Sequence, residues 1–166
     1  MLNLVKNWMD EYGDSLTKAV TLLTGDEHTA QDIVQDVFVS VICSSSPFRG
    51  ESKPYSYLYR IALNRVSRYR KKRKYHNEFS DTVKGDHTFS PEIVNEKSDD
   101  LMHVRTSVAS LSPKLQAVIV LFYFNDYSIA DISSCLSIPE GTVKSRLSRA
   151  KIQLEALLKK EGYPYA

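Results

Sequence analysis

The sequence contains little of what several common classes of protein are built from. Its only cysteines, Cys43 and Cys135, form no Cys-x-x-Cys or Cys/His ligand pattern, so neither a disulfide scaffold nor a structural zinc site is expected. Six glycines and six prolines are few for a β-rich protein of 166 residues. The four histidines are scattered, and no catalytic triad pattern, metalloprotease motif or glycine-rich phosphate loop occurs. The sequence therefore argues against an enzyme and gives no reason to expect a metal or a cofactor.

Long hydrophobic runs are missing too. The longest, at residues 117–124, is much shorter than the roughly 20 apolar residues that a membrane-spanning helix needs. The first 14 residues show no basic start followed by an apolar core, which is the pattern of a secretory signal peptide. We therefore expect a cytoplasmic protein with no membrane insertion of its own.

The net charge is small, but the charges are unevenly distributed along the chain. The 22 basic and 20 acidic side chains give +2 overall. Residues 49–75 carry ten bases against Glu51 alone, and residues 140–166 carry six bases against three acids. Residues 1–48 and 76–104 each have two lysines against seven acids. Two basic blocks in a nearly neutral chain indicate two places that meet an anion.

Apolar residues recur every three or four positions through most of the chain, which predicts helices. Gly25 suits the end of a first helix, and Asp26 can cap the next one, over residues 30–42. A third helix starts near Pro54, a favourable first-turn residue. Further helices are expected near residues 101–111, 113–125, 128–136 and 139–160.

The segment between the third and fourth helices has no periodic apolar face. It contains Gly85, Pro91 and several serine and aspartate residues, so we interpret residues 76–99 as an acidic, flexible linker. No alternating pattern typical of strands persists anywhere in the sequence. The expected fold class is all-α, with two small helical domains at residues 1–75 and 100–166.

The third helix combines an apolar stripe with a strongly basic opposite side. Arg60, Asn64 and Arg68 follow one another at steps of four and lead into five consecutive basic residues at 70–74. Like charges at helical spacing repel each other, so an anionic partner would relieve the repulsion. Phosphates are such partners, and an asparagine can pair with a base edge. Nearby aromatic residues belong either to the core or to the wall of a pocket for an unpaired base.

Residues 128–160 show the pattern of a helix-turn-helix. Ser128 and Asp131 fit the two ends of a capping box, and residues 136–139 form a short turn. In the last helix, Val143 and Leu147 begin an apolar stripe that fixes which side faces outward. The outward side presents small and basic side chains, as a recognition helix in a DNA major groove does. An ordinary helical hairpin with a solvated basic face is the alternative interpretation.

Three segments of the chain resemble bacterial extracytoplasmic-function (ECF) RNA polymerase sigma factors. Residues 23–38 are similar to the segment that grips core RNA polymerase, and residues 48–64 to the segment that melts and reads the promoter −10 element. Residues 128–158, which include the string IPEGTVKSRL, resemble the domain that reads the −35 element. Tyr57 stands where the family usually has tryptophan. The three motifs occur in family order and cover nearly the whole chain apart from the linker.

The resemblance implies a role for each segment. The resemblance assigns core polymerase binding to Asp32, Gln35 and Asp36. It assigns contacts with −10 DNA to Phe48, Arg49, Ser52, Lys53, Tyr57, Arg60, Asn64, Arg65, Arg68, Lys71 and Lys72. It assigns contacts with −35 DNA to Thr142, Lys144, Ser145, Arg146, Ser148 and Arg149. The implied partners are core RNA polymerase, promoter DNA and an anti-sigma factor.

Two other functions could use the same basic helices. A stand-alone helix-turn-helix regulator would bind promoter DNA without docking on the polymerase. An RNA-binding antiterminator would show no preference for duplex −35 DNA. Binding to core polymerase in the absence of DNA separates a sigma factor from the stand-alone regulator.

Overall fold

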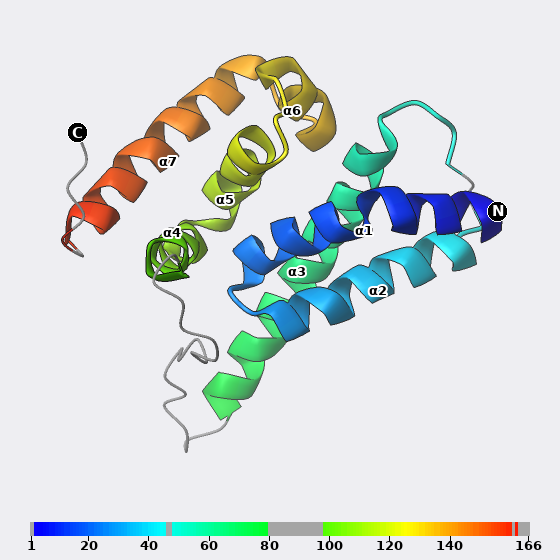
Figure 1. Cartoon of the computed structure of the whole chain (residues 1–166), viewed down its shortest axis with the longest axis horizontal. Helices are drawn as coiled ribbons and strands as arrows, with labels where there is room; N and C mark the ends of the chain where they lie inside the picture. The colour runs from blue at the N-terminus through cyan, green and yellow to red at the C-terminus, as the bar shows by residue number, and fades with distance from the viewer. Residues whose placement is uncertain (1, 46–47, 80–97, 161, 163–166) are drawn as a thin grey trace.

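The protein is built from helices in two consecutive units. The computed structural model describes residues 2–45, 48–79, 98–160 and 162, and these contain helices but no strand (Figure 1). The first unit contains α1 (Leu2–Thr24), α2 (Glu27–Cys43) and α3 (Pro54–Phe79). The second contains α4 (Ser98–Ser110), α5 (Pro113–Ile119), the π-helical segment η1 (Val120–Phe124), α6 (Ile129–Leu136) and α7 (Glu140–Lys160). The all-α fold class expected from the sequence is confirmed.

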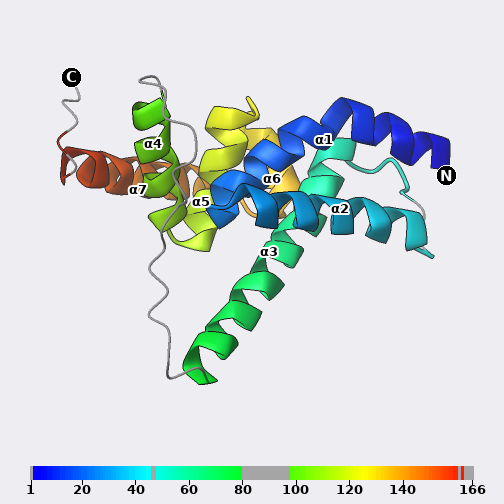
Figure 2. The same ribbon diagram turned by 60° about the horizontal axis from the view of Figure 1, so that its bottom comes forward.

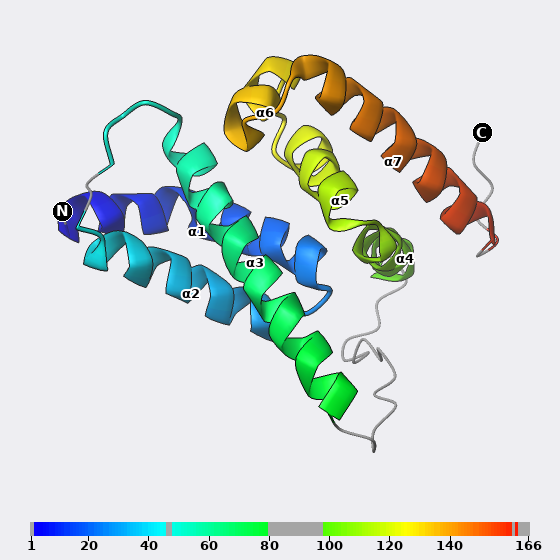
Figure 3. The same ribbon diagram turned by 180° about the vertical axis from the view of Figure 1, so that it is seen from behind.

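A tight turn joins α1 to α2. Gly25 has a φ of 76°, a left-handed conformation that glycine adopts without steric cost, and its N–H donates to the Thr21 carbonyl oxygen at 2.7 Å. Asp26 then caps α2, because its carboxylate accepts a hydrogen bond from the Thr29 N–H at 2.7 Å. The two helices therefore lie side by side, and α3 packs across both of them (Figure 3).

The third helix is longer than the sequence indicated. It continues to Phe79, and α4 begins at Ser98, so residues 76–79 and 98–99 of the expected linker are helical. No glycine or proline occurs between Pro54 and Gly85, so the sequence has no strong breaker at position 75. The C-terminal part of α3 consequently projects away from the other helices (Figure 2). The rest of the expected linker, residues 80–97, lies outside the described residues.

The helix-turn-helix is formed by α6 and α7. The Ser128 hydroxyl accepts from the Asp131 N–H at 3.1 Å, and the Asp131 carboxylate accepts from the Ser128 N–H at 3.3 Å, which completes the expected capping box. Ser137 ends α6 with a φ of 53°. Ile132 and Val143 are both fully buried, so α6 and α7 pack through their apolar sides against the rest of the second unit.

One continuous hydrophobic core runs through both units. It includes Leu16 and Val37 of the first unit together with Val118 and Leu121 of the second. Tyr59 of α3 is completely buried, and its hydroxyl donates to the backbone oxygen of Ala117 in α5 at 3.2 Å. The two units are therefore packed directly against each other.

Candidate polymerase-binding and nucleic-acid interfaces

Helix α2 has one buried apolar face and one exposed polar face. Ile33, Val34, Val37 and Phe38 are at most 7% exposed. Asp32, Gln35 and Asp36 are all exposed on the other side of the helix. The structure thus brings the three expected polymerase-binding residues together on one surface that is open to a partner.

An aromatic cluster holds the loop that precedes α3. The ring of Trp8, on α1, lies 5.0 Å from that of Phe48 and 6.4 Å from that of Tyr57, measured between centroids. The Phe48 and Tyr57 centroids are 5.2 Å apart, and both rings are half-buried. Edge-to-face packing of this kind favours a defined loop position. Trp8 is a supporting residue that the sequence did not single out, because periodicity does not show what an apolar side chain packs against.

The predicted −10 contact residues of α3 fall into two groups. Asn64, Arg68, Lys71 and Lys72 are exposed and carry their polar groups into solvent. Arg60 and Arg65 are half-buried and are already engaged: Arg60 donates to the Ser52 hydroxyl at 3.3 Å, and Arg65 donates to the hydroxyl of Ser40 on α2. The exposed group is immediately available to phosphates, whereas the two arginines also support the loop and α2. Arg49 is exposed and Ser52 half-buried in the loop itself.

Arg70 belongs to the basic run at residues 70–74, but its side chain forms hydrogen bonds inside the molecule. Its guanidinium donates to the backbone oxygen of Leu23 and to the side-chain oxygen of Gln116. Burial lowers the pKa of this guanidinium from its ordinary value. Gln116 is itself fully buried and donates to the carbonyl oxygens of Val108 and Ala109 at 2.9 and 2.8 Å. Arg70 therefore joins the first unit to the second.

Lys53, another predicted −10 contact, forms an ion pair with Asp131 of the helix-turn-helix. Its ammonium lies 2.8 Å from the Asp131 carboxylate, and the two side chains are 61% and 32% exposed. This contact holds the pKa of the Asp131 carboxyl below its ordinary value and raises the pKa of the Lys53 ammonium. The nitrogen also lies 5.3 Å from the centre of the Tyr127 ring. One candidate DNA-binding cation is thus neutralised by the other unit.

The start of α7 presents the predicted −35 contacts. Lys144, Ser145, Ser148 and Arg149 are exposed, while Thr142 and Arg146 are half-buried. Val143 and Ala150 are fully buried and hold the helix against α5 and α6. The exposed side chains therefore share one outward surface, as a recognition helix requires. Arg146 instead lines a groove of about 430 Å³ together with Arg70, Lys71 and Lys114.

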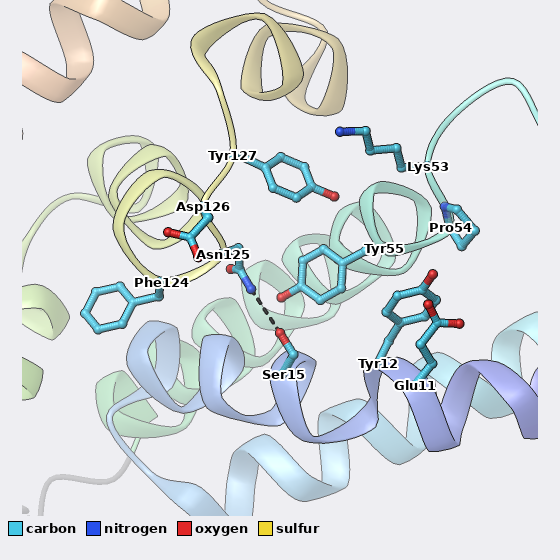
Figure 4. Close-up of a pocket in the computed structure, with 10 residues that line it drawn as sticks. All are labelled: Glu11, Tyr12, Ser15, Lys53, Pro54, Tyr55, Phe124, Asn125, Asp126 and Tyr127. Carbon is cyan, nitrogen blue, oxygen red and sulfur yellow. Dashed lines mark hydrogen bonds between the residues drawn. The ribbon is translucent and has the colours of Figure 1, made fainter.

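A second cavity, of about 560 Å³, lies where the two units meet (Figure 4). Lys53, Tyr12 and Tyr55 approach it from the first unit, and Asn125 and Tyr127 from the second. The Asn125 amide donates to the hydroxyl of Ser15 at 3.0 Å. Burial raises the pKa of the Tyr55 phenol far above its ordinary value, so it stays protonated at every physiological pH.

The described part of the chain gives no sign of a metal centre. Within it, no cluster of three or more histidine, cysteine or acidic residues could hold a metal ion. Among the same residues, none of the helices has both the length and the apolar character to span a bilayer.

Two family models match the chain. The model described as Sigma-70 region 2 matches residues 8–75, which span most of α1 to α3. The model described as Sigma-70, region 4 matches residues 101–154, from α4 to most of α7. Together they place the exposed acidic surface of α2 in the first region and the helix-turn-helix in the second.

Curated relatives match the chain over most of its length. The ECF RNA polymerase sigma factor SigL of Mycobacterium tuberculosis is 30% identical over 162 residues, covering 96% of this chain and 91% of its own. SigW of Bacillus subtilis is 31% identical over 162 residues, which cover 91% of this chain and 87% of SigW. The RNA polymerase sigma-H factor of Pseudomonas aeruginosa is 28% identical over 159 residues, which cover 89% of this chain and 82% of the sigma-H factor. The chain belongs to the ECF family of RNA polymerase sigma factors.

Solved structures share the arrangement of helices. The sigma factor RpoE, crystallised with the anti-sigma factor NepR from Bartonella quintana, has a TM-score of 0.76 and 25% identity, and the match covers 93% of this chain and 98% of that one. CnrH, in complex with the cytosolic domain of CnrY, has a TM-score of 0.71 at 23% identity, covers 98% of this chain and 92% of that one, and shows the fold alone.

Family membership decides between the functions that the sequence left open. The chain is a promoter-recognising sigma factor of transcription initiation, and the stand-alone regulator is not favoured. Sigma factors act by binding core RNA polymerase and promoter DNA, so the function of this family is recognition rather than catalysis.

Proposed function

We propose that the chain uses three separate surfaces for polymerase binding, −10 recognition and −35 recognition. Residues 1–75 form the polymerase and −10 domain, residues 76–99 the acidic linker, and residues 100–166 the −35 domain. The observation that carries the proposal is the outward position of Lys144, Ser145, Ser148 and Arg149, fixed by the buried side of α7. Small and basic side chains at the start of such a helix fit a major groove about 12 Å wide.

In the first domain, Asp32, Gln35 and Asp36 dock on core polymerase. Asn64 and the loop 48–53 contact the melted non-template strand, with Phe48, Arg49, Ser52, Tyr57 and Arg60 around the base. Lys53, Arg65, Arg68, Lys71 and Lys72 contact phosphates. Support for this division comes from exposure, since the amide of Asn64 and the ammonium groups of Lys71 and Lys72 all reach solvent.

In the second domain, Thr142, Lys144, Ser145, Arg146, Ser148 and Arg149 contact the −35 duplex. Arg146 is the member that reaches a phosphate, because it lies toward the groove rather than on the outward face. The protein acts in the cytoplasm without catalytic activity or a cofactor of its own. An anti-sigma factor is a further partner, as it is for the structurally similar RpoE.

Polymerase docking is tested by reversing the charges of α2. The double variant Asp32→Lys/Asp36→Lys should bind core polymerase roughly tenfold more weakly or worse, since like charges facing each other at an interface cost several kcal/mol. The matched control is Asp10→Lys/Asp14→Lys, which makes the same charge change at exposed positions of α1. Competition for core polymerase without DNA gives the readout, and equal binding by the two double variants would contradict the assignment of α2.

Promoter recognition is tested by transcription in vitro with core polymerase on a promoter library. The parent chain should start transcription from a subset of promoters that share a −10 and a −35 sequence. Transcripts independent of both sequences would overturn the proposed division of labour.

A further inference from the structure

The groove that Arg146 lines is a feature that the functions above leave unexplained. It has a volume of about 430 Å³ and is lined by residues of α3, α5, α6 and α7. Small-molecule sites in proteins have volumes of roughly 300–1,000 Å³, so the groove is large enough to hold a ligand. Helix α3 belongs to the first unit and the other three helices to the second, so both units contribute to its walls.

Four basic side chains line this groove, and no acidic side chain does. Arg70 and Lys71 come from α3, Lys114 from α5 and Arg146 from α7. In the described part of the chain, none of the four forms an ion pair with a carboxylate. A cleft lined by charges of one sign focuses their electric field and raises the local concentration of ions of the opposite sign. The groove therefore attracts an anion, and preferentially one with more than one negative charge.

The hydrogen bonds of Arg70 hold its guanidinium in place without neutralising it. Its two acceptors, the Leu23 carbonyl oxygen and the Gln116 side-chain oxygen, are both uncharged. Lys71 and Lys114 are exposed, and their long flexible side chains can turn toward a ligand. A positioned guanidinium beside adjustable ammonium groups is well suited to the oxygens of a phosphate.

The rest of the groove is largely apolar. Val66 and Ala117, which are 1% and 6% exposed, contribute to its wall, and so do the half-buried side chains of Leu63 and Leu136. An inorganic ion would leave this wall in contact with water. A ligand with an apolar body would cover the wall, and the burial of apolar surface favours binding. The groove thus combines a site for a charged group with a site for an apolar one.

The shape of the groove does not suit a DNA duplex. Specific protein–DNA interfaces bury roughly 1,000 Å² of protein surface or more, and a duplex is too wide to enter a groove of about 430 Å³. Its phosphates could contact only the outer ends of side chains such as Lys71 and Arg146. Arg70 and Lys114 are not among the predicted DNA contacts, so DNA binding leaves half of the basic set unexplained.

We propose that this groove binds a small organic phosphate, with the phosphate among the four basic side chains and an apolar body against the wall. Two kinds of molecule share this chemistry: nucleotides, whose base and sugar form the body, and alkyl phosphates. The binding does not depend on the function proposed above. Its consequence does, because Lys71 and Arg146 are also proposed to contact DNA phosphates, so the ligand and promoter DNA would compete for them.

Titration calorimetry of the full chain, without DNA or polymerase, tests the inference. ADP is compared with inorganic pyrophosphate, and octyl phosphate with inorganic phosphate, so that the members of each pair share the charged group. One of the two organic phosphates should bind about tenfold more tightly than its inorganic counterpart, or better, because only it covers the apolar wall. The pair that shows the difference identifies a nucleotide site or an alkyl phosphate site. If neither pair showed it, charge alone would explain the binding and the inference would be overturned.

Two variants locate the binding in the groove. Lys114→Gln removes one exposed cation and should weaken binding of the organic phosphate about fivefold to tenfold, since charge-assisted hydrogen bonds are the stronger ones. Its control, Lys18→Gln, makes the same charge change at an exposed position of α1. Ser67→Trp places a bulky ring at an exposed position that lines the groove and should abolish binding. Its control, Asn77→Trp, changes an exposed residue farther along α3 and should bind as the parent does.

Thermal unfolding shows that each variant is folded, and the organic phosphate should raise the Tm of the parent and the controls but not that of Ser67→Trp. Unchanged affinity in folded Lys114→Gln and Ser67→Trp would overturn the inference. A short peptide of glutamate and leucine that bound when neither organic phosphate did would also overturn it, by identifying a peptide site. Lys114 and Ser67 are not among the proposed DNA or polymerase contacts, so a failure of promoter recognition in the parent chain would be a separate result.

Discussion

At the residue scale, the same amino acid type serves different purposes according to where its helix places it. Arg68 is exposed on α3, whereas Arg70, two positions later, is half-buried and bonded to Leu23 and Gln116. Both belong to a run of basic residues that the sequence presents as one block. Only the exposed members can contribute to a salt-dependent contact with phosphates.

Asn64 and Lys71 allow base reading to be separated from phosphate binding. Asn64→Ala should change the base preference at the −10 element, because an amide can pair with a base edge. Lys71→Ala should weaken all promoters alike and flatten the salt dependence, because a phosphate contact carries no sequence information. Binding of a panel of −10 oligonucleotides at several salt concentrations gives the readout. Uniform loss across the panel for both variants would contradict the role of Asn64.

Trp8 should support the −10 loop through its contacts with Phe48 and Tyr57. Trp8→Ala removes a side chain that is only 5% exposed and should lower the free energy of unfolding by about 3–5 kcal/mol. Trp8→Phe keeps an aromatic ring and should lower the free energy of unfolding by clearly less. Tyr123→Ala, at a ring that is 57% exposed, is the control and should stay within about 0.5 kcal/mol of the parent. Denaturant unfolding followed by circular dichroism measures all three.

At the element scale, capping residues explain where a helix begins, and buried apolar stripes explain which of its sides faces the core. The Asp26 cap and the Ser128/Asp131 capping box were both predictable, because their residues occupy fixed positions relative to the helix start. The end of α3 was not predictable, because no glycine or proline interrupts the sequence there. The buried stripe of α7 was predictable in the same way, which is why its outward surface could be named from the sequence.

Removal of the cap of α2 should destabilise the helix that carries the polymerase-binding surface. Asp26→Ala should lower the free energy of unfolding by about 1 kcal/mol near neutral pH. The hydrogen bond from Thr29 holds the pKa of the Asp26 carboxyl below its ordinary value. The stabilisation is therefore present above the unfolded-state pKa, near 4, and is lost as the pH falls through the lower folded-state pKa. Unfolding measured at pH 7 and at pH 2 should give a difference between parent and variant only at pH 7.

The recognition helix should read DNA through its exposed basic residues. Lys144→Ala and Arg149→Ala should each weaken binding of the matching −35 duplex by roughly 10- to 100-fold, because a basic side chain on a guanine edge contributes about 1–3 kcal/mol of discrimination. Lys159→Ala removes an exposed lysine in the last turn of the same helix and should have little effect. If both variants bound matching and scrambled duplexes as the parent does, α7 would not be the reading element.

At the scale of the whole molecule, the contact between the units was not predictable. Leu58, Ala62 and Val66 of α3 are buried, in agreement with the apolar stripe expected for this helix. Tyr55 and Tyr59 are buried as well, on a second side that the second unit covers. Periodicity indicates that a helix has an apolar side, but it does not say how many neighbours bury it. The exposed candidate residues could therefore be named, whereas the engagement of Lys53 and Arg70 could not.

The ion pair between the units should make the packed form dependent on pH. The pKa of Asp131 is lowered, so its contribution is present above about pH 4 and disappears as the pH falls through the lowered value. The pKa of Lys53 is raised, so its contribution is present below about pH 10 and disappears above the raised value. The free energy of unfolding should accordingly include a small contribution from this pair between the two limits and lose it toward both extremes. In Asp131→Asn it should lose this dependence at the acid end.

The burial of Tyr55 and Tyr59 also bears on how long an open molecule survives. When the units separate, these rings and the apolar side of α5 face water, and a contiguous apolar patch of that kind favours aggregation. A variant that weakens the contact between the units should therefore aggregate more readily than the parent chain.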